Sequence, residues 1–188
     1  MKTAERLRAR RLRIEEGGEQ GFTLIELLVV LLIIGILLAI AIPTFLSVTK
    51  SANNTAAQSN LQTAFTGAKT YFEAANQTYT NIEGPSSYST ILQVDTGLSF
   101  VTKTAASTAS NVVSVYTNGS DVVLTAFSAP TKDCWGILDN TAAGGTAIWT
   151  GYTAVGTFYG VLKNTTSANC KAASYAPGTI LSSGYPAG

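Results

Sequence analysis

The chain has 188 residues, of which 46% are hydrophobic and 12% charged, and its formal net charge is +1. It contains no histidine, which removes Ser-His and Cys-His nucleophile pairs and the commonest metal ligand. The acidic residues after position 72 are scattered, with no metal-loop spacing. We therefore predict no catalytic residue, no metal site and no cofactor, and hence a protein that is not an enzyme.

Residues 1–21 are predicted to be a leader that is removed. They hold half of the Lys and Arg residues of the chain, and no Arg follows them: Lys2, Arg6, Arg8, Arg10, Arg11 and Arg13. Because positive residues stay on the cytoplasmic side of a membrane span, the N-terminal end is predicted inside and the C-terminal part exported.

Residues 22–43 form an apolar run that is long enough to cross a bilayer. About 21 residues at 1.5 Å each span roughly 30 Å of hydrocarbon. No small-residue cleavage site follows the run at Pro43, so it does not read as a secretory signal peptide. The run carries one acid, Glu26, and a charge within hydrocarbon costs about 2.5–3.5 kcal/mol. Glu26 is therefore a candidate functional residue; the alternative is a tolerated acid at headgroup level.

The start of this run resembles the processing motif of the type IV pilin-like family. The residues that carry the resemblance are Gly21, Phe22, Thr23, Leu24, Ile25, Glu26 and Leu27, and it extends to about residue 75. It implies cleavage after Gly21 by a prepilin peptidase and N-methylation of Phe22. It also implies that Glu26 pairs with the Phe22 amine of a neighbouring subunit during assembly.

After Pro43 the helical pattern continues as a predicted amphipathic helix over residues 44–75. Apolar and small residues recur at spacings of mostly three and four: Phe45, Val48, Ala52, Ala56, Leu61, Phe65, Ala68 and Phe72. The polar side carries few charges, so we expect the stripe to pack on the chain's own sheet and not in a coiled coil. Gly35 and Pro43 sit where the family places helix-loosening residues, and we predict that the helix opens there in a filament.

Residues 44–188 are predicted to form one exported domain. A turn is expected at residues 84–87, and Asn118-Gly119 joins two β-rich runs, 111–116 and 121–127, as a hairpin. Further strands are expected over residues 134–138, 147–152 and 157–162. The predicted fold is α+β, with one long helix packed on an antiparallel sheet of about four strands, as in the type IV pilin fold.

The two cysteines, Cys134 and Cys170, both lie in the part predicted to be exported. An oxidising compartment favours a disulfide between them, and two free buried thiols are the alternative. In pilins a disulfide commonly bounds a C-terminal segment, which the tail from Cys134 onward resembles.

Two further sites, one for nucleic acid and one for calcium, are possible from the sequence, and each has a simpler interpretation. Nucleic-acid capture would use dispersed lysines and nearby aromatic residues, which make a weak electrostatic footprint: Lys103, Lys132, Lys163, Lys171, Trp135, Trp149, Tyr152 and Tyr159. Packing of the aromatics in the sheet is favoured instead, and no specific nucleic acid is expected. Asp133 and Asp139 flank a predicted strand and could bind calcium, but a solvated pair is favoured.

These patterns together predict a structural subunit of a type IV pilus. The expected partners are the membrane, a prepilin peptidase, the pilus assembly machinery and further copies of the chain in a helical filament. The expected location is the cytoplasmic membrane before assembly and the cell surface afterwards, with adhesion or motility as roles. The alternatives are a pseudopilin of a type II secretion system, which the cysteine pair disfavours, and a pilin-like DNA-uptake protein.

Overall fold

The computed structural model describes residues 21–83, 97–142, 149, 152 and 154–186. The chain divides into two compact units, Met1–Phe45 and Leu46–Gly188, which are described separately below. The predicted leader, apart from Gly21, and the predicted turn over residues 84–87 lie outside the described residues.

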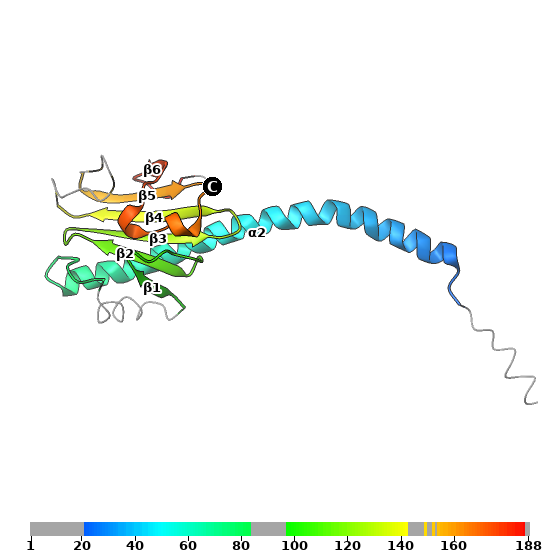
Figure 1. The fold of residues 1–188 in the computed structure, drawn as a ribbon, viewed down its shortest axis with the longest axis horizontal. Coiled ribbons are helices and arrows are strands. Elements are labelled where there is room, and N and C mark those ends of the chain that lie inside the picture. The colour runs from blue at the N-terminus through cyan, green and yellow to red at the C-terminus, as the bar shows by residue number, and fades with distance from the viewer. Residues whose placement is uncertain (1–20, 84–96, 143–148, 150–151, 153, 187–188) are drawn as a thin grey trace, which may run out of the picture. The chain divides into compact units, whose positions relative to one another are not determined.

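Helix α2 (Leu24–Ala74) contains 51 residues, close to the predicted range of 22–75 (Figure 1). Its first half is rich in Leu, which favours helix, and in Ile, which is apolar. The helix ends where Asn76 and Gln77 adopt positive φ angles of 56° and 60°. The Gln77 N–H then donates to the Phe72 carbonyl at 2.9 Å, which satisfies a carbonyl that the helix end would leave unpaired.

The buried face of α2 is made of mostly small residues within the second unit. The six buried residues recur mainly at spacings of three and four: Asn54, Ala57, Leu61, Ala64, Gly67 and Ala68. Small side chains let the helix backbone approach the sheet closely. The predicted stripe is confirmed from Leu61 onward, where Phe65 and Phe72 also pack against the core. Its first part is wrong, because Phe45 and Val48 are 70% and 64% exposed.

Six strands form one sheet in the order β1-β2-β3-β4-β5-β6. Their bounds are β1 (Ser99–Thr102), β2 (Val112–Thr117), β3 (Asp121–Ser128), β4 (Asp133–Asn140), β5 (Gly156–Leu162) and β6 (Thr179–Leu181). Every neighbouring pair is antiparallel except β1 and β2, which are parallel. The α+β class is therefore confirmed, whereas the prediction of about four antiparallel strands missed the two short edge strands.

The strand predicted over residues 147–152 falls mainly outside the described residues. Trp149 and Tyr152, which are described, are not in a strand. Trp149 is instead buried, with its ring centroid 5.3 Å from that of Tyr175 in the C-terminal segment. The strand was predicted from the aromatic and β-branched composition of this run. The same composition also suits residues that are buried in a core without pairing in a sheet, as Trp149 is.

The two faces of the sheet carry separate cores. On one face, α2 packs on alternate side chains of the central strands, among them Val122, Leu124 and Trp135. On the other face, Val123, Phe127 and Leu138 pack against the segment that holds the short helices η1 (Ser167–Asn169) and η2 (Ala172–Ser174). Because both faces are covered, every residue of β3 and β4 is buried.

The predicted hairpin at Asn118-Gly119 is confirmed. It joins β2 to β3, and Thr117 is paired with Val122. Gly119 has a φ of +99°, which a residue with a side chain rarely adopts. The Asn118 Oδ1 accepts the Asp121 N–H at 2.9 Å and closes the turn.

Candidate functional site

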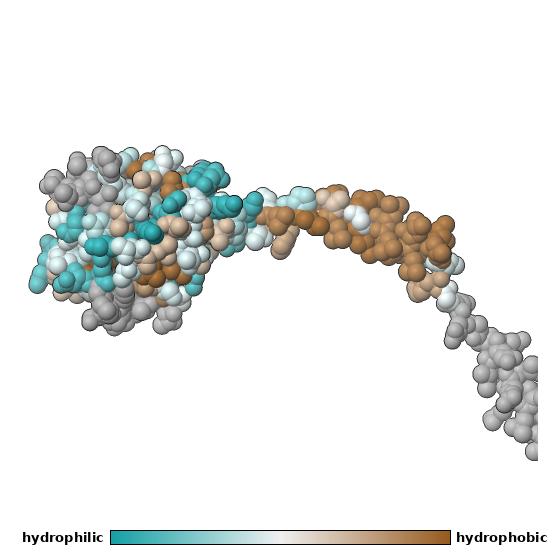
Figure 2. Space-filling view, viewed as in Figure 1, coloured by the Kyte–Doolittle hydropathy of each residue, from teal (hydrophilic) through white to brown (hydrophobic). Residues whose placement is uncertain are grey.

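The apolar segment before residue 46 is the first candidate site. Every described residue from 21 to 48 is exposed. Figure 2 shows apolar colour along most of this stretch, whereas the folded unit shows mixed polarity. Among the described residues, α2 is the one helix long and apolar enough to cross a membrane, by length and composition alone. The described residues leave this segment uncovered, and an exposed apolar surface of this size marks an interaction site.

Glu26 lies in the first turn of α2, where it completes a capping box with Thr23. The Thr23 N–H and hydroxyl each donate to Glu26 Oε2 at 2.7 Å. The Glu26 N–H donates in return to Thr23 Oγ1 at 3.3 Å. Thr-x-x-Glu before an apolar run is a readable signature of a helix start, and the sequence interpretation missed it. The carboxylate thus has a local structural role in addition to any role in assembly.

Gly21 and Phe22 precede the helix in irregular backbone. Apart from its chain neighbours, no described residue has an atom within 4 Å of where a Cβ on Gly21 would stand, so packing against the described residues does not require glycine there. The Phe22 side chain is 80% exposed. The described part of the chain therefore leaves both residues exposed.

The helix is continuous through Gly35 and Pro43. Pro43 cannot donate a hydrogen bond to the carbonyl of Ala39, one turn earlier. The next residue, Thr44, donates its hydroxyl to the Ile40 carbonyl at 3.0 Å. The predicted opening in a filament concerns another environment and stays a prediction.

In the folded unit, Cys134 and Cys170 form a disulfide with a Cα–Cα distance of 5.5 Å. Both cysteines are fully buried. The bond joins β4 to the segment between η1 and η2, which crosses the second face of the sheet. It therefore closes the C-terminal segment over the core.

A buried carboxylate, Asp139 on β4, ties the end of α2 to the sheet. Its Oδ2 accepts from Lys69 Nζ at 2.7 Å and from the Tyr79 hydroxyl at 2.6 Å, and its Oδ1 accepts from the Thr157 hydroxyl at 2.8 Å. Asp133, at the other end of β4, is also buried. Its Oδ1 accepts the Asn164 N–H at 3.2 Å. The prediction of a solvated pair was wrong, because both carboxylates are bound within the protein.

Burial sets the ionisation of several groups in this unit. Burial raises the pKa of Tyr79 far above its usual value, and its hydrogen bond to the Asp139 carboxylate adds to the effect. Burial also raises the pKa of Asp121, opposed by the Asn118 hydrogen bond and supported by the nearby charge of Asp139. The Asp121 Oδ1 is buried and has no hydrogen-bond partner among the described residues. Asp121 is thus a less well satisfied acid than Asp139.

The residues weighed for nucleic-acid binding do not form one surface. Trp135 and Trp149 are buried in the two cores. Lys103 Nζ lies 3.6 Å from Glu83 Oε2 and 4.8 Å from the Tyr116 ring centroid. The favoured interpretation, in which the tryptophans pack against the sheet, is confirmed. In the described part of the chain no group of three or more Cys, Asp or Glu residues is placed to hold a metal ion.

The apolar segment with the acid near its start was compared with known protein families. Residues 18–42 match the family model of the prokaryotic N-terminal methylation motif. That segment identifies the chain as similar to the type IV pilins, which are structural subunits and not enzymes.

Two curated relatives each match a part of the chain. The type IV major pilin protein PilA of Myxococcus xanthus is 47% identical over 53 residues, which cover 28% of this chain and 24% of the relative. The type IV narrow pilus major component PilA5 of Thermus thermophilus is 62% identical over 34 residues, covering 18% of this chain and 29% of the relative. The chain thus spans about a quarter of the length of these relatives. No solved structure matches it significantly.

Proposed function

We propose that this chain is the precursor of a structural subunit of a type IV pilus. The precursor is cut after Gly21 by a prepilin peptidase, Phe22 is methylated, and residues 22–43 hold the subunit in the cytoplasmic membrane with residues 1–21 inside. The assembly machinery then moves the subunit into a helical filament in which residues 22–43 form the core. Residues 44–188 form the exported domain.

The observation that carries this proposal is the exposure of the apolar segment together with its acid. The apolar side chains of residues 24–42 are exposed in the described part of the chain, and hydrocarbon or other copies of the helix would cover them. Two environments in succession, bilayer and filament core, meet this need. Both relatives are named as pilus components, which supports the same conclusion.

Glu26 is proposed to set the register of assembly. Cleavage after Gly21 turns the Phe22 nitrogen from an amide into a charged amine. In a filament core, pairing of that amine with the Glu26 carboxylate of a neighbour neutralises two charges that apolar surroundings penalise. The capping interactions with Thr23 keep the carboxylate at the start of the helix, where this neighbour can reach it.

Isolation of sheared surface filaments tests the proposed function. Filaments from cells that produce the chain should contain it, and deletion of its gene should remove it from the sheared fraction. A chain that stays in the membrane while filaments or secretion depend on it would instead favour a pseudopilin. Purified filaments also allow the helix between Gly35 and Pro43 to be examined, and an unbroken helix there would contradict the proposed opening.

A further inference from the structure

Three exposed lysines gather at one end of the folded unit. Lys50 is on α2, Lys132 is in the turn between β3 and β4, and Lys163 follows β5. The Thr165 N–H donates to the Lys132 carbonyl at 2.7 Å, which joins the last two segments. Thr131 donates its hydroxyl to the Asn54 Oδ1 at 2.6 Å, which joins the turn to α2. We call Lys50, Lys132 and Lys163 with the segments that carry them the basic end.

The basic end has no exposed carboxylate to neutralise it among the described residues. Its one acid, Asp133, is 6% exposed and accepts from the Asn164 N–H. The two ion pairs in the described part of the chain use other lysines, Lys69 and Lys103. The acids Asp121 and Asp139 lie at the opposite end of the β3–β4 pair, where they are register neighbours of Asn140 and Val122. The exposed lysines and these two acids therefore lie at opposite ends of the strands.

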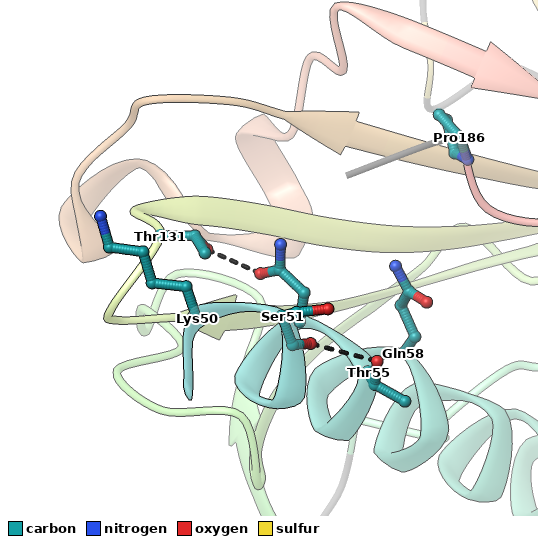
Figure 3. A pocket seen from close by; sticks show the side chains of 7 residues that line it. Lys50, Ser51, Thr55, Gln58, Thr131 and Pro186 are labelled. Atoms are coloured by element: carbon teal, nitrogen blue, oxygen red, sulfur yellow. Dashed lines mark hydrogen bonds between the residues drawn. The ribbon is translucent and has the colours of Figure 1, made fainter. Parts of the chain in front are cut away.

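An open pocket of about 460 Å³ lies beside Lys50 (Figure 3). Lys50, Ser51, Gln58 and Thr131 line it from two elements, and its other lining residues are Asn54, Thr55 and Pro186. The lining contains one ammonium, several hydroxyl and amide groups, and no carboxylate. The Thr55 and Thr131 hydroxyls donate within the chain, to the Ser51 carbonyl and to Asn54 Oδ1. The ammonium of Lys50, the hydroxyl of Ser51 and the amide of Gln58 are donors of the kind that bind phosphodiester oxygens.

Lys132 occupies a backbone position that does not favour lysine. Its φ is +60°, in the left-handed region, where glycine and asparagine are locally preferred. Its N–H donates to the Ser128 carbonyl at 2.9 Å, so the turn holds it there. Glycine can therefore replace Lys132 without backbone strain, which allows the charge to be tested by substitution.

We propose that the basic end binds the headgroup phosphates of anionic phospholipids on the exported side of the membrane. Lys50 is seven positions after Pro43, so the basic end is the part of the folded unit that follows the apolar segment most closely in the chain. Lysines close to an anionic membrane surface are attracted to it. Three lysines without arginine fit this diffuse surface better than a nucleic-acid duplex, whose binding needs a larger basic footprint. The inference rests on the membrane-anchored precursor in the proposed function.

Amine labelling of the full chain in vesicles tests the inference. The chain is reconstituted in phosphatidylcholine alone, or in an equal mixture of phosphatidylcholine and phosphatidylglycerol. It is treated with an amine-acetylating reagent, and each lysine is quantified by peptide mass spectrometry. Labelling of Lys50, Lys132 and Lys163 should fall about threefold in the anionic vesicles and recover at high salt. Lys103, which is paired with Glu83, is the internal reference and should keep the same labelling in both.

Two matched variants separate charge from folding. Lys132→Gly removes a charge at a position whose φ glycine prefers, so the melting temperature should stay the same or rise while the protection of Lys50 and Lys163 weakens. Lys103→Gln removes one charge outside the basic end and should leave the protection of all three lysines unchanged. Loss of protection in both variants alike would overturn the inference in favour of a net-charge effect.

Other outcomes distinguish the inference from the proposed function. Resistance of the chain to alkaline extraction first establishes insertion. A chain that does not insert overturns the proposed function and this inference with it, whereas an inserted chain with equal labelling in both lipids overturns this inference alone. Protection by duplex DNA on neutral vesicles, without protection by phosphatidylglycerol, would assign the basic end to nucleic acid and overturn the lipid proposal.

Discussion

Residues 22–45 and residues 46–186 contain similar apolar side chains but cover them differently. In the first region, residues as large as Leu24 and Ile40 are 81% and 68% exposed. In the second, Leu61, Ile137 and Trp135 are fully buried in cores that the chain itself supplies. In the proposed function, the first region is covered by a bilayer or by other copies of the chain, whereas the second is covered by its own packing.

The polar groups of the two regions differ in the same way. Glu26, in the first region, interacts with Thr23 alone among the described residues and is otherwise open to a partner from outside. Asp139, in the second, has three protein partners and 3% exposure of its side chain. Substitutions in the first region should thus affect assembly, and substitutions in the second should affect folding.

The largest expected effect is the loss of filaments in Glu26→Gln. Glutamine preserves the Thr-x-x-Gln form of the capping box, so the start of the helix and membrane insertion should be retained. The charge that pairs with the Phe22 amine is lost, and filament yield should fall at least about tenfold, because a tenfold change corresponds to only 1.4 kcal/mol. Electron microscopy of sheared filaments measures the yield.

Thr23→Ala is the matched control for this variant. It removes the capping hydroxyl, worth about 1 kcal/mol, but leaves the carboxylate charged. Filament yield should therefore fall much less than in Glu26→Gln. Equal loss in the two variants would mean that Glu26 acts through the helix start and not through its charge.

The disulfide should give the largest effect on folding in the second region. Its cysteines are 36 positions apart, and closing such a loop stabilises by about 4 kcal/mol in the chain-entropy model, as an upper figure. Reduction of a fragment that begins at residue 46 should lower its melting temperature by many degrees. The Cys134→Ala/Cys170→Ala variant, insensitive to reductant, is the control. An unchanged melting temperature on reduction would show that this disulfide does not stabilise the fold.

Asp139→Ala should destabilise the second region by about 2–3 kcal/mol. The substitution leaves the buried Tyr79 hydroxyl without an acceptor and releases the half-exposed Lys69. Tyr79→Phe removes only the hydroxyl and should cost about 1–2 kcal/mol. Denaturant unfolding measures both free energies. A loss in Asp139→Ala no larger than the loss in Tyr79→Phe would contradict the carboxylate as the centre of this network.

The smallest expected effect is a gain in stability at neutral pH in Asp121→Asn. Burial raises the pKa of Asp121 in the folded state above the unfolded value of 3.8. The wild type is therefore favoured below that pH and loses stability as the pH rises through the folded pKa. The free energy of unfolding of Asp121→Asn should exceed that of wild type at pH 7, and the gain should vanish near pH 3. A destabilised variant at pH 7 would show that the Asn118 contact outweighs burial.

The long helix and the central strands could be predicted from the sequence, because their patterns are long. Strands β2 to β5 each hold six to eight residues, and their ends fall within two residues of the predicted ones. Strands β1 and β6, with four and three residues, are too short for a periodic signal and are fixed by pairing with their neighbours.

The site could be predicted only where it is local in sequence. Glu26 and Gly21 follow from a contiguous motif, and the Thr23 capping partner could have been found in the same motif. The Asp139 network joins residues 69, 79, 139 and 157, which only the folded chain brings together. The basic end likewise joins residues from three separate segments, and dispersed lysines in a sequence do not reveal it.

Mass spectrometry of the intact subunit from sheared surface filaments tests the central claim most directly. If the chain is cut after Gly21 and assembled through its apolar helix, the filament subunit should begin at methylated Phe22 and retain both cysteines in a disulfide. Subunits that still carry residues 1–21, or filaments that lack this chain altogether, would contradict the account.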